Sequence, residues 1–255
     1  MLMRVILPIA GLAIAILLWG LGVAALDART PIAAAFSPLN TAYAFEELIT
    51  GRDIWLHVAL SLKRVGVGLF IAIAVGVPLG ILVATSKMFA QGTTPLFQLL
   101  RMVSPLSWMP LAVMVLGVGD APVYFLLAFA AVWPVLLNTV AGVKQLDPNW
   151  LLLARSLSAT RWETVWRVIL PGITAHILTG VRLAIGIIWI VLVPAEMLGV
   201  SAGLGYFILD TRDRLAYSEL MAAIILIGIL GYLLDYAART AHEKWLHVKK
   251  TEHIN

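Results

Sequence analysis

Several charged residues of this chain lie inside long apolar stretches. Lys63 and Arg64 are neighbours in one such stretch, and Arg182 and Glu196 lie in another. Charged side chains in membrane-embedded segments usually face a bundle interior or a water-filled cavity, where they mark a path for ions or polar substrates. A cationic path would suit an anion. The alternative is that the two arginines pair structurally with Glu196 or with Asp235 on neighbouring helices.

Other polar or aromatic side chains in the apolar stretches could line the same path. A tryptophan at helical spacing, such as Trp108, is more often a packing or interface residue than a ligand contact. The residues predicted for the path are Lys63, Arg64, Trp133, Asn138, Arg182 and Glu196.

Nothing in the sequence indicates an enzyme with chemistry of its own. The absence of cysteine excludes disulfides and thiolate metal sites. The chain also lacks the G-x-x-x-x-G-K-[ST] phosphate loop, so it cannot bind ATP by that route. The histidines are scattered: they are His57, His176, His242, His247 and His253. We therefore expect no catalytic residue, no metal and no cofactor in this chain.

The composition indicates that a lipid bilayer is the solvent. Of the 255 residues, 61% are apolar and only 13% are charged. Soluble domains carry about 25% charged residues, and the mean hydropathy of +0.95 is far above theirs. The net charge of +4 comes from basic residues scattered among apolar segments, which argues against a nucleic-acid partner.

Six stretches qualify or nearly qualify as membrane spans, each of which takes roughly 20 residues. They run at about 5–26, 57–85, 96–117, 122–142, 173–198 and 218–238. The first could be a signal peptide, but its apolar run exceeds the ~7–15 residues of a typical signal core, which favours a retained helix. Between the first two, Ser37-Pro38 and Gly51 are typical of the start and end of a short surface helix. We predict an all-α polytopic membrane protein.

The distribution of lysine and arginine predicts the orientation. With a cytoplasmic N-terminus, ten of these residues fall in inside segments, four in outside segments and four within or near spans. Both termini are then cytoplasmic. The predicted division is 1–54 for the first helix and an external segment, 55–239 for the membrane domain and 240–255 for a cytoplasmic basic tail.

The long inside loop between the fourth and fifth spans has the pattern of two short helices at an angle. Asp147 can cap the first helix, with Pro148 at its first position. Thr160 with Glu163 forms a capping box for the second. We expect Pro171-Gly172 to end that second helix and turn the chain into the fifth span.

Two interpretations of this loop remain open on spacing alone. Its tryptophans could hold a hairpin at the membrane surface. Alternatively, a polar tip rigidly joined to the spans could dock a soluble partner. The tip residues are Arg155, Ser156, Ser158, Thr160 and Arg161.

The loop resembles the conserved cytoplasmic loop of binding-protein-dependent ABC importer permeases. That family's pattern is Glu-Ala-Ala, three residues, Gly, nine residues, Ile, one residue and Leu-Pro. In this chain Leu152 stands at the Glu position and Ser158 at the Gly position, while Leu170-Pro171 match. The resemblance runs through roughly 55–239, including the segments GVPLG, TGVRLAIG, PAEMLG and GLGYFI. The segment SPLSWMP, at 104–110, resembles nitrate and bicarbonate permeases in particular.

The resemblance implies a type I ABC importer permease fold with about six transmembrane helices and a cytoplasmic coupling-helix loop, in the cell inner membrane. It implies three partners: a cytoplasmic ATPase dimer that binds ATP and magnesium, a periplasmic or lipid-anchored binding protein, and a second, identical permease subunit. Nitrate is the favoured cargo, with bicarbonate, cyanate, a sulfonate or taurine as alternatives. Two other functions compete with this one: an ATP-independent channel or carrier, and a membrane scaffold that anchors an ATPase without transporting anything. The residues expected to couple to the ATPase are Ala154, Arg155, Ser156, Ser158, Ala159, Thr160 and Arg161.

Overall fold

Helices make up most of the chain. The computed structural model describes residues 3–27, 30–51 and 53–252. In chain order the elements are α1 (Met3–Asp27), η1 (Pro31–Phe36), α2 (Pro38–Thr50), α3 (Asp53–Thr85), α4 (Lys87–Met102), η2 (Pro105–Trp108), α5 (Met109–Leu116), α6 (Asp120–Gln145), α7 (Pro148–Ser156), α8 (Arg161–Thr164), η3 (Val165–Ile169), α9 (Leu170–Gly199), α10 (Leu204–Asp213) and α11 (Tyr217–Glu252). Both η1 and η2 are 3-10 helices, and η3 is a π-helical segment. These residues contain no strand, which confirms the all-α prediction.

The core is a layer of three long helices, with α6 packed between α3 and α9. Small residues bring the backbones together: a Cβ added at Gly68 would lie 2.7 Å from Cβ of Leu127, and one added at Gly80 would lie 2.7 Å from Cβ of Thr139. Close approach through small residues is the usual way in which membrane helices associate. The largest buried apolar cluster lies where these helices meet.

Five helical segments of the described chain are long and apolar enough to cross a membrane, and a sixth crossing follows if α4 and α5 count as one span. They include α1, α3, α6, α11 and the continuous helical run Arg161–Gly199. The prediction of a polytopic membrane protein with about six crossings is therefore confirmed.

The third predicted span, at 96–117, is divided between two helical segments that meet at a sharp bend. The chain bends by 92° between α4 and the segment formed by η2 and α5. Val103 and Ser104 adopt extended ψ angles of 128° and 129°. The residue before a proline is disfavoured in the α conformation, and Pro105 follows this pair. A hydropathy window registers apolar residues on both sides of the break but not their change in direction.

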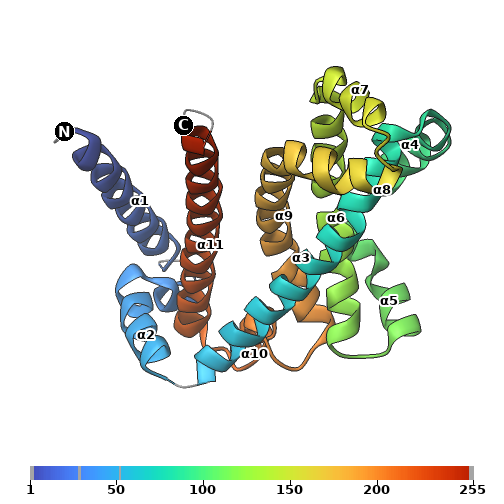
Figure 1. Ribbon diagram of the computed structural model, residues 1–255. Helices are drawn as coiled ribbons and strands as arrows, with labels where there is room; N and C mark the ends of the chain where they lie inside the picture. Colours follow the sequence, from blue (N-terminus) through green and yellow to red (C-terminus); the bar gives the residue numbers. More distant parts are fainter. Residues whose placement is uncertain (1–2, 28–29, 52, 253–255) are drawn as a thin grey trace.

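Figure 1 shows α1 standing apart from the three-helix core. Its contacts are with η1 and α2, and none of its apolar window is buried. The short helix predicted after it is present as α2, where the Ser37 hydroxyl accepts from Asn40 N–H and Gly51 is the C-cap. These local assignments are confirmed.

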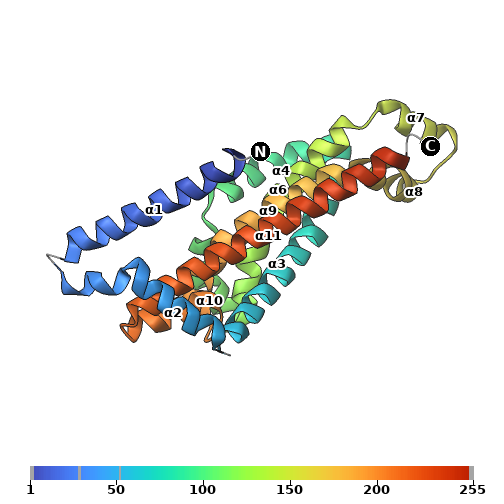
Figure 2. The same cartoon turned by 90° about the vertical axis from the view of Figure 1, so that its left-hand side faces the viewer.

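The molecule has two distinct ends. The loop of α7 and α8 lies at one end, together with the start of α1 and the end of α11 (Figures 1 and 2). The opposite end holds α2, α10 and the start of α11. Residue 240 lies inside α11, which runs without a break to Glu252.

Candidate functional site

The α7–α8 loop is built by local capping, as the sequence predicts. Asp147 Oδ1 accepts a 2.9 Å hydrogen bond from the Asn149 N–H at the start of α7. At the start of α8, the N–H of Glu163 donates to Thr160 Oγ1, and the N–H of Thr160 donates to Glu163 Oε2. These bonds pin the first turn of each helix, so that the loop is a defined shape and not a loose connection.

Ser158 breaks the chain between the two helices. Its φ of 56° lies in the left-handed region that favours glycine. The N–H of Ser158 donates to the Arg155 carbonyl, and the N–H of Ala159 donates to the Ala154 carbonyl. The family pattern places glycine at this position, and the serine of this chain adopts a backbone conformation that suits glycine.

The predicted tip residues divide into an exposed set and a buried one. Ala154 is only 6% exposed, and Ala159 is half-buried. Ala154 therefore positions α7 and does not form part of its outer surface. The predicted polar residues are exposed, and they share the tip with exposed apolar side chains: Leu152, Leu153, Leu157 and Trp162.

The helix α8 does not end at Pro171, contrary to the prediction. Helical structure continues from Arg161 through η3 into α9, and Figure 1 shows the path turning there without stopping. Proline lacks the N–H that an interior helical position would use. Pro171 stands at the start of α9, directly after the π-helical turn, where its missing donor is tolerated. The tip is thus joined to a core helix through continuous helical backbone.

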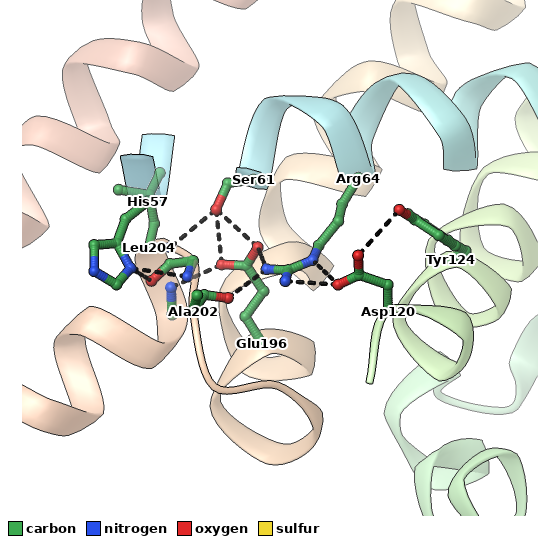
Figure 3. Close-up of polar contacts among 10 residues, drawn as sticks. His57, Ser61, Arg64, Asp120, Tyr124, Glu196, Ala202 and Leu204 are labelled. Atoms are coloured by element: carbon green, nitrogen blue, oxygen red, sulfur yellow. Dashed lines mark hydrogen bonds and ion pairs between the residues drawn. The ribbon is translucent and has the colours of Figure 1, made fainter. Parts of the chain in front are cut away.

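A second polar centre lies where α6 begins and α9 ends, far from the α7–α8 loop (Figures 1 and 3). The guanidinium of Arg64 bridges two carboxylates. Its Nη1 lies 2.6 Å from Glu196 Oε1, while Nη2 and Nε lie 2.7 and 2.9 Å from Asp120 Oδ1. Nη1 also donates to the carbonyl of Ala202 at 2.6 Å. We call Arg64, Asp120 and Glu196 the Arg64 network.

The connection between α9 and α10 folds back onto this network. Ser61 Oγ donates to the Glu196 carboxylate at 2.7 Å and accepts from the Leu204 N–H at 2.9 Å. The N–H of Gly205 donates to Glu196 Oε2 at 2.9 Å. Gly203, with a φ of 128°, makes the turn. The network thereby joins α3, α6, α9 and the start of α10.

Only two of the six predicted path residues meet in this centre. Arg64 and Glu196 do so, and their contact is the structural pairing that was the alternative. Arg182 likewise pairs with Asp235, at 3.6 Å, on the surface between α9 and α11. Lys63 is exposed.

The other two predicted path residues lie along α6. Asn138 donates to the Pro134 carbonyl within its own helix at 2.8 Å. Trp133 packs edge-on against Phe129, and Trp108 contacts the same ring, with ring centroids 5.6 Å apart in both pairs. Within the described residues, the indole N–H groups of both tryptophans are buried without a hydrogen-bond partner. These residues form an aromatic row apart from the Arg64 network.

Sequence reasoning missed Asp120, Ser61 and Tyr124. A weak signal existed for Ser61, which is three residues before Arg64 and so lies on the same helical face. Asp120 begins α6 directly after a turn in which Gly117 and Gly119 have positive φ angles. No neighbouring residue in the sequence indicates that Asp120 will meet Arg64. Tyr124, one turn further along α6, donates to Asp120 Oδ2 at 3.3 Å.

A cavity of about 590 Å³ opens beside the network. Its lining includes Arg64, Asp120, Ser201, Ala202 and Tyr206. A second cavity, of about 710 Å³, lies between α2, α3, α10 and α11. The described residues of its lining include four carboxylates, together with Arg214 and His57. Of the two cavities, only the first contacts a buried cation.

Comparison with known proteins agrees with the fold. Residues 76–247 match the family described as binding-protein-dependent transport system inner membrane component. The nitrate import permease protein NrtB of Synechocystis is 31% identical over 236 residues, which are 91% of this chain and 86% of that protein. The bicarbonate transport system permease protein CmpB of Synechococcus elongatus is 38% identical over 183 residues, 71% of this chain and 65% of that protein.

Among solved structures, a chain of the MetNI methionine ABC transporter in an inward-facing conformation has a TM-score of 0.62 at 16% identity. The match covers 77% of this chain and 95% of that chain. This likeness confirms the predicted type I importer permease fold. The family match covers more than half of the chain, and the alignment with NrtB covers most of both proteins. The chain therefore belongs to the binding-protein-dependent transport system inner membrane components.

Proposed function

We propose that this permease subunit forms the membrane path for a small anion and that a separate ATPase drives the transport. Nitrate is the favoured cargo, and bicarbonate, cyanate, a sulfonate or taurine are the alternatives. The similar proteins named for nitrate and bicarbonate support a small anion. The guanidinium of Arg64 lines an open cavity, where it could contact a small anion if one of its two carboxylate partners moved away.

The observation that carries the ATPase proposal is the α7–α8 loop. It protrudes at one end of the molecule, exposes a mixed polar and apolar tip, and continues into α9 as a helix. Such a tip fits a cleft on a soluble partner. A push on it would move α9 directly, and ATP-driven closure of the partner would then favour one arrangement of the spans over the other.

The partners follow from the same proposal. A cytoplasmic ATPase dimer binds ATP and magnesium, and a periplasmic or lipid-anchored binding protein delivers the cargo. A second, identical permease subunit completes the path within the lipid bilayer. Transport needs no catalytic residue in this chain.

The orientation is inferred from the positive-inside rule. The basic residues of one end belong to α4, to the end of α6, to the α7–α8 loop or to η3: they are Lys87, Lys144, Arg155, Arg161 and Arg167. That end of the molecule then faces the cytoplasm, as do both termini. The end that carries α2, α10 and the Arg64 network faces outward, and we call it the outer end.

Reconstituted vesicles test the proposal. The permease, its partner ATPase and its binding protein are incorporated together, and uptake of nitrate, bicarbonate and taurine is measured with and without ATP. We expect uptake of one anion only when ATP, ATPase and binding protein are all present. Uptake without the ATPase would indicate a channel or secondary carrier. ATPase binding without any ATP-dependent uptake would indicate a scaffold.

A further inference from the structure

We propose that the Nε–Nη2 edge of Arg64 is an oxyanion-binding site, and that Asp120 occupies it as an intramolecular substitute for the cargo. This inference deepens the proposed function and rests on it. The incoming anion displaces the Asp120 carboxylate, binds the guanidinium at the outer end and leaves when Asp120 returns. Displacement is an exchange of non-covalent contacts, with no bond made or broken.

The two carboxylates of the Arg64 network are not equivalent. Glu196 is 0% exposed, and both of its oxygens accept hydrogen bonds from Ser61, with Arg64 and the Gly205 N–H adding one each. A carboxylate held on every side cannot leave without exposing several unpaired buried groups. Glu196 is therefore the permanent counter-charge of Arg64.

Asp120 is held much more loosely. Its side chain is 37% exposed, against 4% for Arg64. Only Oδ1 contacts the guanidinium, and Oδ2 accepts a long 3.3 Å bond from Tyr124. Asp120 also begins α6, so its charge stays favoured by the helix N-terminus when it rotates away from Arg64. These features make Asp120 the exchangeable partner.

The geometry of the contact leaves room for a better ligand. One oxygen, Asp120 Oδ1, accepts from both Nε and Nη2, at 2.9 and 2.7 Å. The guanidinium edge presents two parallel donors that match two oxygens of a single planar anion. Nitrate and bicarbonate carry such a pair of oxygens, and a sulfonate can present two of its three. Chloride offers one point of contact and fits this edge less well.

The net charge of the Arg64 network and the volume of the adjacent cavity are both compatible with the replacement of Asp120 by an anion. With Asp120 in place the network carries one cation and two carboxylates, so an additional anion would be repelled. An anion that replaces Asp120 leaves the charge around Arg64 unchanged. The adjacent cavity of about 590 Å³ reaches both Arg64 and Asp120. Pockets of about 300–1,000 Å³ hold drug-sized ligands, so this one has ample room for a small oxyanion and for water.

Anion binding to the purified full-length chain in detergent tests the site without ATPase or binding protein. Nitrate is titrated calorimetrically into wild type, Asp120→Asn and Asp213→Asn, with chloride as the comparison anion. Asp213 is an exposed carboxylate on α10 at the same end, so its variant changes the net charge equally. We expect nitrate to bind Asp120→Asn about tenfold more tightly than wild type, as it should if Arg64 is free of Asp120 about a tenth of the time. Asp213→Asn should stay within about twofold of wild type, in line with the small energies of exposed charges.

Equal tightening in Asp120→Asn and Asp213→Asn would overturn the inference, because it would indicate a general charge effect. No tightening in Asp120→Asn would also overturn it, as would chloride binding as tightly as nitrate. A further variant, Arg64→Lys in the Asp120→Asn background, should lose the preference for nitrate because lysine lacks the two-donor edge. Uptake by vesicles that contain the wild-type chain tests the proposed function separately. Anion binding without ATP-driven uptake would refute the transport function but would not contradict the anion-binding site.

Discussion

The carboxylate of Glu163 accepts hydrogen bonds from both the backbone N–H and the hydroxyl of Thr160, at 2.9 and 2.8 Å. The backbone bond, followed by the hydroxyl bond, holds the pKa of Glu163 below its ordinary value of 4.5. A lowered pKa in the folded state means that the contribution to stability is complete above that ordinary value. It is lost as the pH falls below 4.5 and through the lowered pKa.

Glu163→Ala should loosen the start of α8 at every pH, because alanine removes the acceptor of the Thr160 N–H and leaves only the bond from the backbone N–H of residue 163 to Thr160 Oγ1. Glu163→Gln should keep the box, since glutamine also accepts from the Thr160 N–H, but it should remove the titration. Hydrogen exchange of the amides at 160–164 measures both effects. We expect the amides of wild type to exchange more slowly than those of the Gln variant at neutral pH, where Glu163 is ionised, and to approach the Gln variant as the pH falls below 4.5. An Ala variant that protects these amides as well as wild type would show that the box does not hold the loop.

Ser158 provides a second test of the loop, through its backbone. A non-glycine residue in the left-handed region is strained by about 1–2 kcal/mol. Ser158→Gly should relieve that strain and preserve ATP-driven uptake in vesicles, while Ser158→Val should reduce uptake because a β-branched residue fits this conformation poorly. Both substitutions remove the hydroxyl, so equal losses in the two variants would instead assign the effect to a side-chain contact.

The sequence predicted those parts of the fold that depend on neighbouring residues. The caps at Ser37, Asp147 and Thr160 each act over two or three positions, and all are present. The pairing of Arg64 with Glu196 was predicted only as an alternative, and its pairing with Asp120 was missed, because these carboxylates lie 132 and 56 residues away. No local rule indicates which of several distant carboxylates will meet a buried cation. Packing of α3, α6 and α9 decides that.

Two features that the sequence left open also have a physical origin. The sharp bend before Pro105 cannot be detected from hydropathy, which is the same for a straight and a bent span. Ala154 was assigned to the coupling surface from its place in the family pattern, and the structure shows that its side chain is buried. A pattern of residue types specifies which positions form the loop. Which of its faces is exposed depends on the packing of α7 against η3.

The burial of Ala154 changes the experiment that tests ATPase coupling. Leu153 is the better position, because it is 62% exposed on the adjacent face of α7. Leu153→Asp should leave the chain folded and abolish co-purification with the ATPase, since an exposed apolar contact becomes a charge. Leu39→Asp is the matched control: Leu39 is 65% exposed on α2, at the opposite end.

Pull-down of the ATPase and size-exclusion profiles measure the two effects separately. Ala154→Asp should instead disturb the folding of the loop, because it would bury a carboxylate. If Leu153→Asp retained full ATPase binding and uptake, the α7 tip would not be the coupling surface.

Substitution of Glu196 tests how much the Arg64 network contributes to the free energy of unfolding. Glu196→Ala would leave Arg64 buried with a weaker set of partners and would remove the acceptor of the Gly205 N–H. Breaking a buried ion pair by removing one partner costs about 3–5 kcal/mol. We expect a loss of unfolding free energy in that range when the purified chain is titrated with denaturing detergent.

Asp235→Ala is the control for that measurement. Asp235 also meets two arginines, Arg239 at 2.8 Å and Arg182 at 3.6 Å, but all three side chains are more than a third exposed. Exposed pairs contribute about 0–1 kcal/mol, because solvent screens them and holding long side chains in place costs entropy. The same deletion of one carboxylate should therefore be several times more costly at Glu196 than at Asp235. Equal losses would mean that water enters the Arg64 network and screens it, and Glu196 would then be an exchangeable partner like Asp120.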